Sequence, residues 1–160
     1  MMIRSAAAAV ASAVVLTLGI GVAVVSTQSG KAPASKPSVA TFKSPTCGCC
    51  AKWNEHMTAA GYAVTSRDMT DMNAVKDEHR VPTALRSCRT ALVAGYVLEG
   101  HVPADVVAKL LAERPAGVMG LAVPGMPAGS PGMESPDGFK TPYQVMAFTQ
   151  DGQSRVYATK

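Results

Sequence analysis

The chain has 160 residues, of which 48% are apolar and 16% are charged, and its formal net charge is +4 with a pI near 9.0. Once the N-terminus is set aside, this length fits one domain of ordinary globular composition. Lysine and arginine form no run, so the mild basic excess argues against a nucleic-acid-binding protein. Aromatic residues make up only 5%, and we therefore expect a core of Val, Leu, Ala and Met.

An apolar segment opens the chain. Arg4 provides a positive charge, and residues 5–25 are uncharged and consist mainly of Ala, Val, Leu and Ile. This pattern is typical of a signal peptide or a membrane anchor, with a buried helix as the third reading, and we assign residues 1–26 to a signal or anchor. Residues 27–38 are rich in Ser, Lys and Pro and are interpreted as a flexible linker. A signal or an anchor would place the domain at residues 39–160 outside the cytoplasm.

The first half of this domain alternates strand and helix signals. Residues 39–43 and 62–67 have the composition of strands, and residues 51–60 have that of a helix with one apolar stripe. A second helix is expected at residues 71–79, because Asp71 suits its N-cap and a Val-Pro pair follows its end.

The second half predicts two hairpins with a helix and a long loop between them. We expect a hairpin at residues 90–99 around Ala94-Gly95, and a helix between Pro103 and Pro115. Residues 117–138 are so rich in Gly and Pro that we expect an irregular loop. A second hairpin is expected at residues 144–158, around an Asp-Gly turn.

The order of these elements predicts the fold class. It is strand, helix, strand, helix, hairpin, helix, loop, hairpin. A strand that leads into a cysteine turn at a helix start, with a later hairpin and closing helix, is the thioredoxin-like layout. We therefore expect an α/β, thioredoxin-like fold with a central mixed sheet flanked by helices, extended by a C-terminal Gly/Pro/Met loop and hairpin.

Three of the four cysteines lie within four residues. Cys47 and Cys50 have C-x-x-C spacing, and Cys49 is an extra thiol between them. At the start of a helix these sulfurs would meet free backbone N–H groups and the positive end of the helix dipole. Both effects favour the thiolate, which is the form that binds metals and attacks disulfides.

Cys88 lies far away in sequence, just before the first hairpin. In a thioredoxin-like layout the segment that enters this hairpin runs beside the cysteine turn, so Cys88 would contribute a fourth sulfur. Three or four thiolates around one point suit soft ions, chiefly Cu(I) and also Zn(II) or Ag(I). We therefore predict a metal site at Cys47, Cys49, Cys50 and Cys88.

Two other uses of these cysteines stay open. One is a pair of structural disulfides in an oxidising compartment, in which Cys88 bonds one cysteine of the cluster and the other two bond each other. The other is a redox-active dithiol formed by Cys47 and Cys50. A metal site and a redox dithiol overlap, since the same thiolates serve both kinds of chemistry.

Methionine and histidine offer auxiliary candidates. Met126 and Met133 lie in the Gly/Pro loop, where a thioether is either a soft copper ligand or an apolar plug. His101 precedes a helix and is either close to Cys88 or a capping or surface residue. His56 and His79 are expected to be solvated on helix surfaces.

Three segments carry a resemblance to a known family: Lys43–Cys50 (KSPTCGCC), Gly100–Ala104 (GHVPA) and Gly120–Glu134 (GLAVPGMPAGSPGME). They resemble the CopG-type copper-resistance family of periplasmic metal-binding proteins, which is distinct from the DNA-binding repressors of similar name. The resemblance implies a thioredoxin-like fold, a bacterial periplasmic setting and copper(I) held by cysteines, with a multi-copper thiolate cluster as one form. The family's cysteine motif falls on the four cysteines already named.

One position departs from the family pattern. Relatives commonly have Ser-Cys-His-Thr at the fourth cysteine, whereas this chain has Ser87-Cys88-Arg89-Thr90. Arg89 cannot replace a histidine ligand, because the guanidinium stays protonated. A cation at this position would instead stabilise thiolates or offset the negative charge of a thiolate cluster.

These observations predict a periplasmic copper(I)-binding protein that acts in copper handling or resistance. The expected partners are metal ions and other periplasmic copper-resistance proteins, with no nucleic acid. The alternative is an enzyme, a thiol–disulfide or copper oxidoreductase that uses the Cys47/Cys50 pair. The extra Cys49, the remote Cys88 and the methionine loop favour the binding protein, because a dithiol exchanger needs only two sulfurs.

Overall fold

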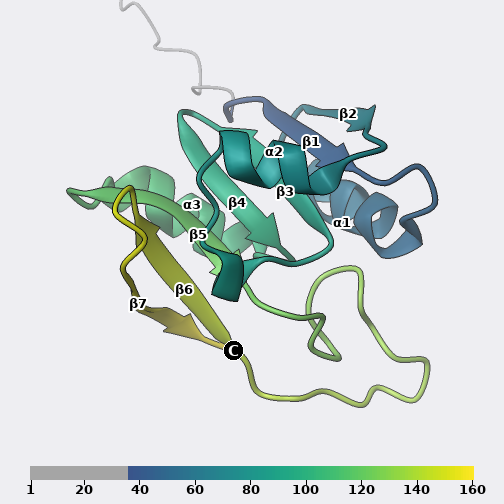
Figure 1. Ribbon diagram of the computed structural model, residues 1–160. Helices are drawn as coiled ribbons and strands as arrows, with labels where there is room; N and C mark the ends of the chain where they lie inside the picture. Colours follow the sequence, from purple (N-terminus) through teal and green to yellow (C-terminus); the bar gives the residue numbers. More distant parts are fainter. Residues whose placement is uncertain (1–35) are drawn as a thin grey trace, which may run out of the picture. The chain divides into compact units, whose positions relative to one another are not determined.

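The computed structural model describes residues 36–160, and the predicted signal or anchor and most of the linker lie outside them. In this part of the chain seven strands form one mixed sheet, with three α-helices and one short 3-10 helix, η1 (Figure 1). None of the helices at residues 36–160 is both long and apolar enough to span a bilayer. The elements are β1 (Val39–Lys43), α1 (Gly48–Ala59), β2 (Val64–Asp68), α2 (Met72–Glu78), η1 (Thr83–Leu85), β3 (Arg89–Val93), β4 (Tyr96–Gly100), α3 (Ala104–Glu113), β5 (Val118–Val123), β6 (Gln144–Thr149) and β7 (Ser154–Thr159).

The strands lie in the order β2-β1-β3-β4-β5-β6-β7. The β1/β2 and β4/β5 pairs are parallel, and the other neighbouring pairs are antiparallel. The predicted α/β class with a central mixed sheet and flanking helices is therefore confirmed. Both predicted hairpins are present. Ala94 and Gly95 have positive φ angles of 47° and 85°, as a two-residue hairpin turn requires.

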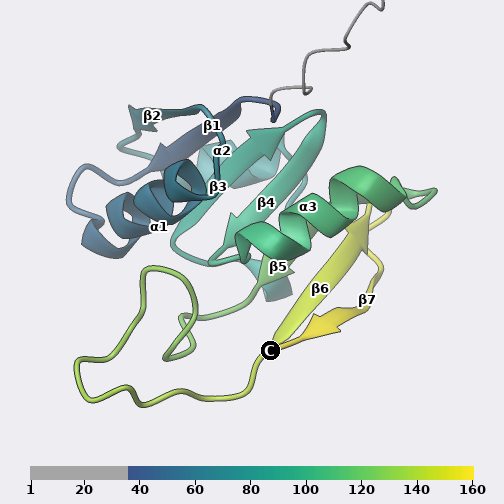
Figure 2. The ribbon, with the colours of Figure 1, turned by 180° about the vertical axis from the view of Figure 1, so that it is seen from behind.

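Helices cover both faces of the sheet. α1 and α3 lie on one face, seen from the front in Figure 2, and α2 lies on the other, seen in Figure 1. The larger apolar core lies under α1 and α3 and includes Trp53, Met57 and Val107, and a smaller core on the opposite face includes Val97 and Phe148. Alternate residues of β3 and β4 point into these two layers.

The expected loop at residues 117–138 is wrong at its start, because residues 118–123 form strand β5. β5 lies between β4 and β6, and its last four residues are buried. A Cβ atom at Gly120 would lie 2.2 Å from the carbonyl oxygen of Val97 and 2.6 Å from the Phe148 ring. This glycine is thus required by close strand packing and does not break the strand.

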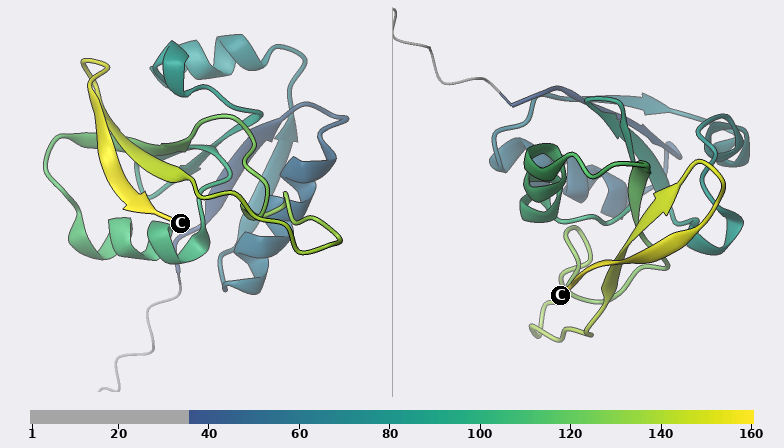
Figure 3. Two further views of the ribbon diagram at one scale, coloured as in Figure 1. Left: turned by 90° about the horizontal axis from the view of Figure 1, so that it is seen from below. Right: turned by 90° about the vertical axis from the view of Figure 1, so that its left-hand side faces the viewer.

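Residues 124–143 form the loop that connects β5 to β6. Figure 3 shows this segment folding back beside α1 before the chain enters the last hairpin. Gly132 fixes the contact, because a Cβ atom there would lie 2.6 Å from the carbonyl oxygen of Cys49 and 3.0 Å from the backbone nitrogen of Trp53. The loop therefore packs closely on the first turn of α1.

Candidate metal centre

The cysteine turn begins helix α1. Cys47 is the N-cap, with φ of −78° and ψ of 90°, and Gly48 is the first helical residue. Cys49 and Cys50 therefore lie in the first turn, as predicted, where backbone N–H groups have no partner within the helix. Cys50 is fully buried, whereas Cys47 and Cys49 are half-buried.

Trp53 fixes this helix on the sheet. It lies one turn after Cys50, is fully buried, and its Nε1 donates a hydrogen bond to the carbonyl oxygen of Val102 at 2.8 Å. Met57, one further turn along, is also fully buried. The apolar stripe read from the sequence thus faces the core and sets the direction in which the cysteines point.

The segment before β3 brings Cys88 to the cysteine turn. The Cys50 sulfur lies 3.9 Å from the carbonyl oxygen of Cys88, and the sulfurs of all four cysteines lie within 4.8 Å of one another. The structure therefore gathers the four predicted cysteines into one cluster, Cys47, Cys49, Cys50 and Cys88, which we call the sulfur cluster.

Two of the four sulfurs are covalently joined. Cys47 and Cys50 form a disulfide, whereas Cys49 and Cys88 are free. The Cys47 and Cys49 sulfurs are 3.6 Å apart. The alternative with two structural disulfides is wrong, since Cys88 bonds no other cysteine. The bonded pair is the C-x-x-C pair, and its two-electron reduction would convert the cluster into four thiols.

A buried carboxylate fixes the approach to Cys88. One oxygen of Glu99 accepts hydrogen bonds from Lys76 Nζ and from the backbone N–H of Ser87, each at 2.6 Å. Its other oxygen accepts a hydrogen bond from the Thr90 hydroxyl at 2.7 Å. Lys76, Glu99 and Thr90 are all buried. Sequence reasoning missed this network, although a glutamate within the apolar run of β4 was a signal for it.

Arg89 is buried on the opposite side of β3, against α1. Its guanidinium lies 3.6 Å from the centre of the Trp53 ring, and its three nitrogens make no hydrogen bond with any residue from 36 to 160. Burial lowers the pKa of Arg89 to about 9, and the negative charges of Cys88 and Cys49 oppose this shift. The guanidinium therefore remains a cation at neutral pH, on the residue that follows Cys88 in the chain.

His101 is fully buried and contacts Cys88, so the surface role considered for it is wrong. Its Nδ1 lies 2.7 Å from the carbonyl oxygen of Pro131, and its Nε2 lies 3.0 Å from the Cys88 sulfur. Because a carbonyl only accepts, Nδ1 carries the proton and Nε2 presents its lone pair to the sulfur. Burial lowers the pKa of His101 to about 4 and raises the pKa of the Cys88 thiol.

The two loop methionines follow glycines that contact the segments carrying the cysteines. The hydroxyl of Ser87, the residue before Cys88, donates a hydrogen bond to the carbonyl oxygen of Gly125 at 2.5 Å. The residue that precedes Met126 therefore contacts the segment that carries Cys88. Met126 is 54% exposed, so it does not plug the loop onto the domain. Met133 is half-buried. Met133 follows Gly132, whose backbone lies against the first turn of α1.

His56 corrects another expectation. It is half-buried rather than solvated, and its Nε2 accepts a hydrogen bond from the backbone N–H of Ala104 at 3.1 Å. It therefore caps the start of α3 from α1. His79 is also half-buried, and its ring lies 5.7 Å from that of Phe42.

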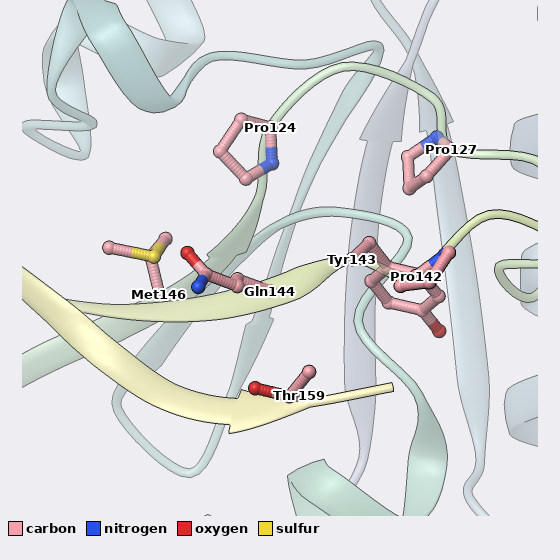
Figure 4. Close-up of a pocket in the computed structure, with 7 residues that line it drawn as sticks. All are labelled: Pro124, Pro127, Pro142, Tyr143, Gln144, Met146 and Thr159. Carbon is pink, nitrogen blue, oxygen red and sulfur yellow. The ribbon is translucent and has the colours of Figure 1, made fainter.

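A hollow of about 460 Å³ lies elsewhere, at the start of β6 (Figure 4). Figure 4 shows that none of the four cysteines lines it. Its walls are mostly apolar and hold one thioether. The lining residues are Pro124, Pro127, Pro142, Tyr143, Gln144, Met146 and Thr159. The hollow and the sulfur cluster are therefore separate features of residues 36–160.

The fold and the four sulfurs define a class, an α/β protein with a cysteine cluster of metal-binding type. A family described as a protein of unknown function, DUF411, matches residues 85–133. Two solved structures, forms 1 and 2 of a copper resistance protein CopG, are 42% identical to this chain, with a TM-score of 0.73. Each alignment covers 78% of this chain and 98% of the other. No curated protein matches the chain.

The chain belongs to the CopG-type copper-resistance family. The identity extends over nearly all of the related chains, so the family assignment made from three short segments is confirmed.

Proposed function

We propose that this chain is an exported, periplasmic protein that handles copper(I) through the thiolates of Cys47, Cys49, Cys50 and Cys88. Residues 1–26 would direct export as a signal peptide or hold the protein as an anchor, and residues 27–38 would link that segment to the metal-binding domain at 39–160. The copper ion is the cargo of the protein, not a resident cofactor. Its metal partners and any other copper-resistance proteins would meet it in the periplasm.

The fold part of this proposal is a thioredoxin-like domain. The parallel β1-α1-β2 unit, the antiparallel β3-β4 hairpin and α3, with the strand order β2-β1-β3-β4, support it. In such a domain the first turn of α1 and the segment entering β3 lie side by side. β5, β6 and β7 then extend the sheet on one side, and the methionine loop comes from that extension.

The single observation that carries the proposal is the gathering of four sulfurs within 4.8 Å. Thiolates are soft ligands that favour Cu(I), and Zn(II) or Ag(I) would be substitutes at the same donors. His101 adds an unprotonated nitrogen 3.0 Å from the Cys88 sulfur, so it is an auxiliary ligand candidate. The donor set therefore fits copper(I) once the Cys47–Cys50 bond is reduced.

The test is anaerobic Cu(I) titration of the reduced protein against a chromophoric chelator, with thiols counted in parallel. The Cys47→Ser, Cys50→Ser double variant should lose most of its tightly bound copper, because two soft anionic ligands are gone. The matched control is Thr46→Ser, an exposed neighbour that should bind copper normally. Full copper loading by the double variant would reject the proposal.

The second candidate function is a thiol–disulfide or copper oxidoreductase, and the Cys47–Cys50 disulfide is the observation that favours it. In thiol exchange, one thiolate of an external dithiol attacks the Cys47–Cys50 bond and forms a mixed disulfide with one of these cysteines. The second thiolate of the external dithiol then attacks the mixed disulfide, so that Cys47 and Cys50 are reduced and the external dithiol becomes a disulfide. In copper reduction, two Cu(II) ions take the two electrons of the dithiol, giving two Cu(I), the disulfide and two protons.

The Cys88→Ser variant separates these two functions. In the binding protein it lowers copper affinity or stoichiometry, because it removes one of four thiolates. In the oxidoreductase it leaves the Cys47/Cys50 exchange intact, and insulin reduction by an external dithiol proceeds at the wild-type rate. Normal copper loading of Cys88→Ser with wild-type disulfide exchange would favour the enzyme.

Met126 and Met133 would tune copper retention without building the site. A neutral thioether is a weaker ligand than a thiolate, and Met126 is largely exposed. Met126→Leu keeps size and apolarity while it removes the sulfur. We expect faster loss of Cu(I) to the chelator with an unchanged melting temperature. Unchanged copper retention would remove Met126 from the set of ligands.

A further inference from the structure

Ser87 lies where three segments of the chain meet. Its backbone N–H donates a hydrogen bond of 2.6 Å to Glu99, a buried carboxylate of β4. A Cβ atom at Gly100, the last residue of β4, would lie 2.8 Å from both the Cβ and the Oγ atoms of Ser87, and it would collide with the carbonyl oxygen of Val123 at the end of β5. Only a glycine permits this close packing, which fixes the position of Ser87 between the ends of β4 and β5.

The hydroxyl of Ser87 connects the loop that follows β5 to this fixed position. It donates a hydrogen bond to the carbonyl oxygen of Gly125 at 2.5 Å. The second hydrogen bond between residues 124–134 and the domain outside the loop joins His101 Nδ1 to the carbonyl oxygen of Pro131 at 2.7 Å. Among residues 36–160, no other hydrogen bond connects residues 124–134 to a group outside the loop.

Backbone hydrogen bonds within the loop make residues 127–133 a compact turn. The N–H of Gly129 donates to the carbonyl oxygen of Met133 at 2.9 Å, and the N–H of Met133 donates to that of Ser130 at 2.8 Å. The N–H of Ser130 donates in turn to the carbonyl oxygen of Pro127 at 3.1 Å. A segment with many internal bonds and two bonds to its surroundings opens as one unit, so its position depends on those two bonds.

The loop lies against both segments that carry the free thiols. Gly125 contacts the residue before Cys88, and the backbone of Gly132 packs on the carbonyl oxygen of Cys49. Both thiols are half-buried. A loop that lifts from Ser87 would therefore uncover the side of the sulfur cluster that it contacts.

We propose that Ser87 is a positioning residue that holds residues 124–134 against the sulfur cluster, and that copper(I) enters and leaves the cluster when this contact opens. The inference rests on the proposed function and adds how access to the same site is regulated. Ser87 acts through the loop and does not ligate the metal. Loss of its hydroxyl speeds the uptake and the release of copper(I) by the same factor, so the dissociation constant stays unchanged.

The first measurement uses the metal-free full chain with the Cys47–Cys50 disulfide intact. Hydrogen–deuterium exchange of peptides that cover residues 124–134 and the rate at which iodoacetamide alkylates Cys49 both report opening of the loop. Ser87→Ala should raise both rates about fivefold, because the closed state loses one hydrogen bond of ordinary strength. Ser87→Thr keeps the hydroxyl and should stay within about twofold of the wild type.

The matched control is Thr58→Ala. Thr58 is exposed on α1, and its hydroxyl donates a hydrogen bond to the carbonyl oxygen of Asn54 at 2.9 Å. This variant loses a bond of the same kind within α1, and it should leave the exchange of the loop and the alkylation of Cys49 at their wild-type rates.

The second measurement uses the reduced, anaerobic full chain and follows the uptake of Cu(I) from a chromophoric chelator and its release to the same chelator. In Ser87→Ala both rates should rise about fivefold, while the dissociation constant changes by less than about twofold. A residue that only holds Cys88 in place would raise the dissociation constant instead.

The outcomes separate this inference from the function on which it rests. It is overturned by wild-type exchange of the loop in Ser87→Ala, by faster exchange without faster alkylation of Cys49, by equal acceleration in Ser87→Ala and Ser87→Thr, or by a raised dissociation constant. A wild-type protein that binds no Cu(I) when reduced overturns the proposed function, whereas the measurements on the metal-free protein still decide whether Ser87 holds the loop.

Discussion

Two buried cations lie on opposite faces of strand β3, Lys76 of helix α2 on one face and Arg89 of β3 itself on the other, and their surroundings differ. On the α2 face, Lys76 is paired with Glu99 at 2.6 Å and also contacts the Thr90 hydroxyl at 3.2 Å. On the α1 face, Arg89 stacks on the Trp53 ring at 3.6 Å, and its guanidinium nitrogens make no hydrogen bond within residues 36–160. The first cation is paired with a buried carboxylate, whereas the second is stacked on an aromatic ring and follows Cys88 in the chain.

The Lys76–Glu99 pair and Arg89 therefore act differently on the stability of the fold. The Lys76–Glu99 pair fixes the Ser87 backbone through a hydrogen bond of 2.6 Å, so it holds the segment that carries Cys88. It acts in every state of the protein. Arg89 has no such carboxylate partner, and stacking on the Trp53 ring offsets only part of the cost of burying its charge.

The largest loss of stability is expected on the α2 face, where Lys76 pairs with Glu99. Glu99→Gln removes the charge that compensates Lys76, which is 4% exposed, and leaves a buried ammonium without its counter-ion. We expect a loss of about 3–5 kcal/mol in the free energy of unfolding, measured by urea denaturation of the reduced, metal-free protein. A loss below about 1 kcal/mol would show that water replaces the carboxylate, and the contrast between the two faces would disappear.

The control for this variant removes both charges. The Lys76→Met, Glu99→Leu double variant should recover much of the lost stability, because apolar side chains of similar volume replace a buried pair at little cost. It should still bind copper less well, since the Ser87 N–H loses its acceptor. Recovered stability together with wild-type copper affinity would mean that Glu99 does not position Cys88.

A smaller loss of stability is expected where the loop at residues 124–143 packs on the first turn of α1. Gly132→Ala adds a Cβ atom 2.6 Å from the carbonyl oxygen of Cys49 at a φ of +87°. We expect a loss of about 2–4 kcal/mol and weaker copper retention, because the loop must lift from α1.

Gly138→Ala is the matched control for the loop. Its φ is +75° and open space surrounds its Cβ position, so only backbone strain of about 1 kcal/mol is expected. Thermal unfolding and chelator competition measure both variants. Equal effects of the two would assign the whole loss to strain and none to the contact with the cysteine turn.

The smallest effect concerns His56, which caps α3 on the same face as Arg89. His56→Ala should cost about 1 kcal/mol, because the Ala104 N–H loses its acceptor. His79→Ala, which removes a histidine with a ring contact to Phe42 instead, should cost less. Urea denaturation at neutral pH compares the two.

The pH dependence of this loss has a defined sign. Burial lowers the pKa of His56 below its ordinary 6.5, so the unfolded chain binds a proton more readily than the folded protein. The stabilising effect of His56 is therefore present above pH 6.5 and is lost as the pH falls through the folded-state pKa. The difference between wild type and His56→Ala should shrink in that range. A difference that grows on acidification would contradict the capping role.

The sequence predicted most of the elements because their signals are local. The stripe of Trp53, the cap at Asp71 and the turn at Ala94-Gly95 each depend on a few neighbouring residues. Asp71 indeed accepts hydrogen bonds from the N–H groups of Asn73 and Ala74. Strand β5 was missed because the same local rule counts Gly120 as a breaker.

The sequence also determined the candidate cysteines, because C-x-C-C spacing at a helix start constrains three sulfurs by itself. Only the tertiary structure decided that Cys88 joins them, that Cys47 and Cys50 are bonded, and that His101 is buried beside Cys88. It alone decided which buried cation received a carboxylate. Lys76 and Glu99 are 23 residues apart, and their pairing depends on how α2 packs on β4, which no local pattern contains. Arg89 was identified in the sequence as a cation beside Cys88, but its burial without an acceptor follows only from the packing of β3 against α1.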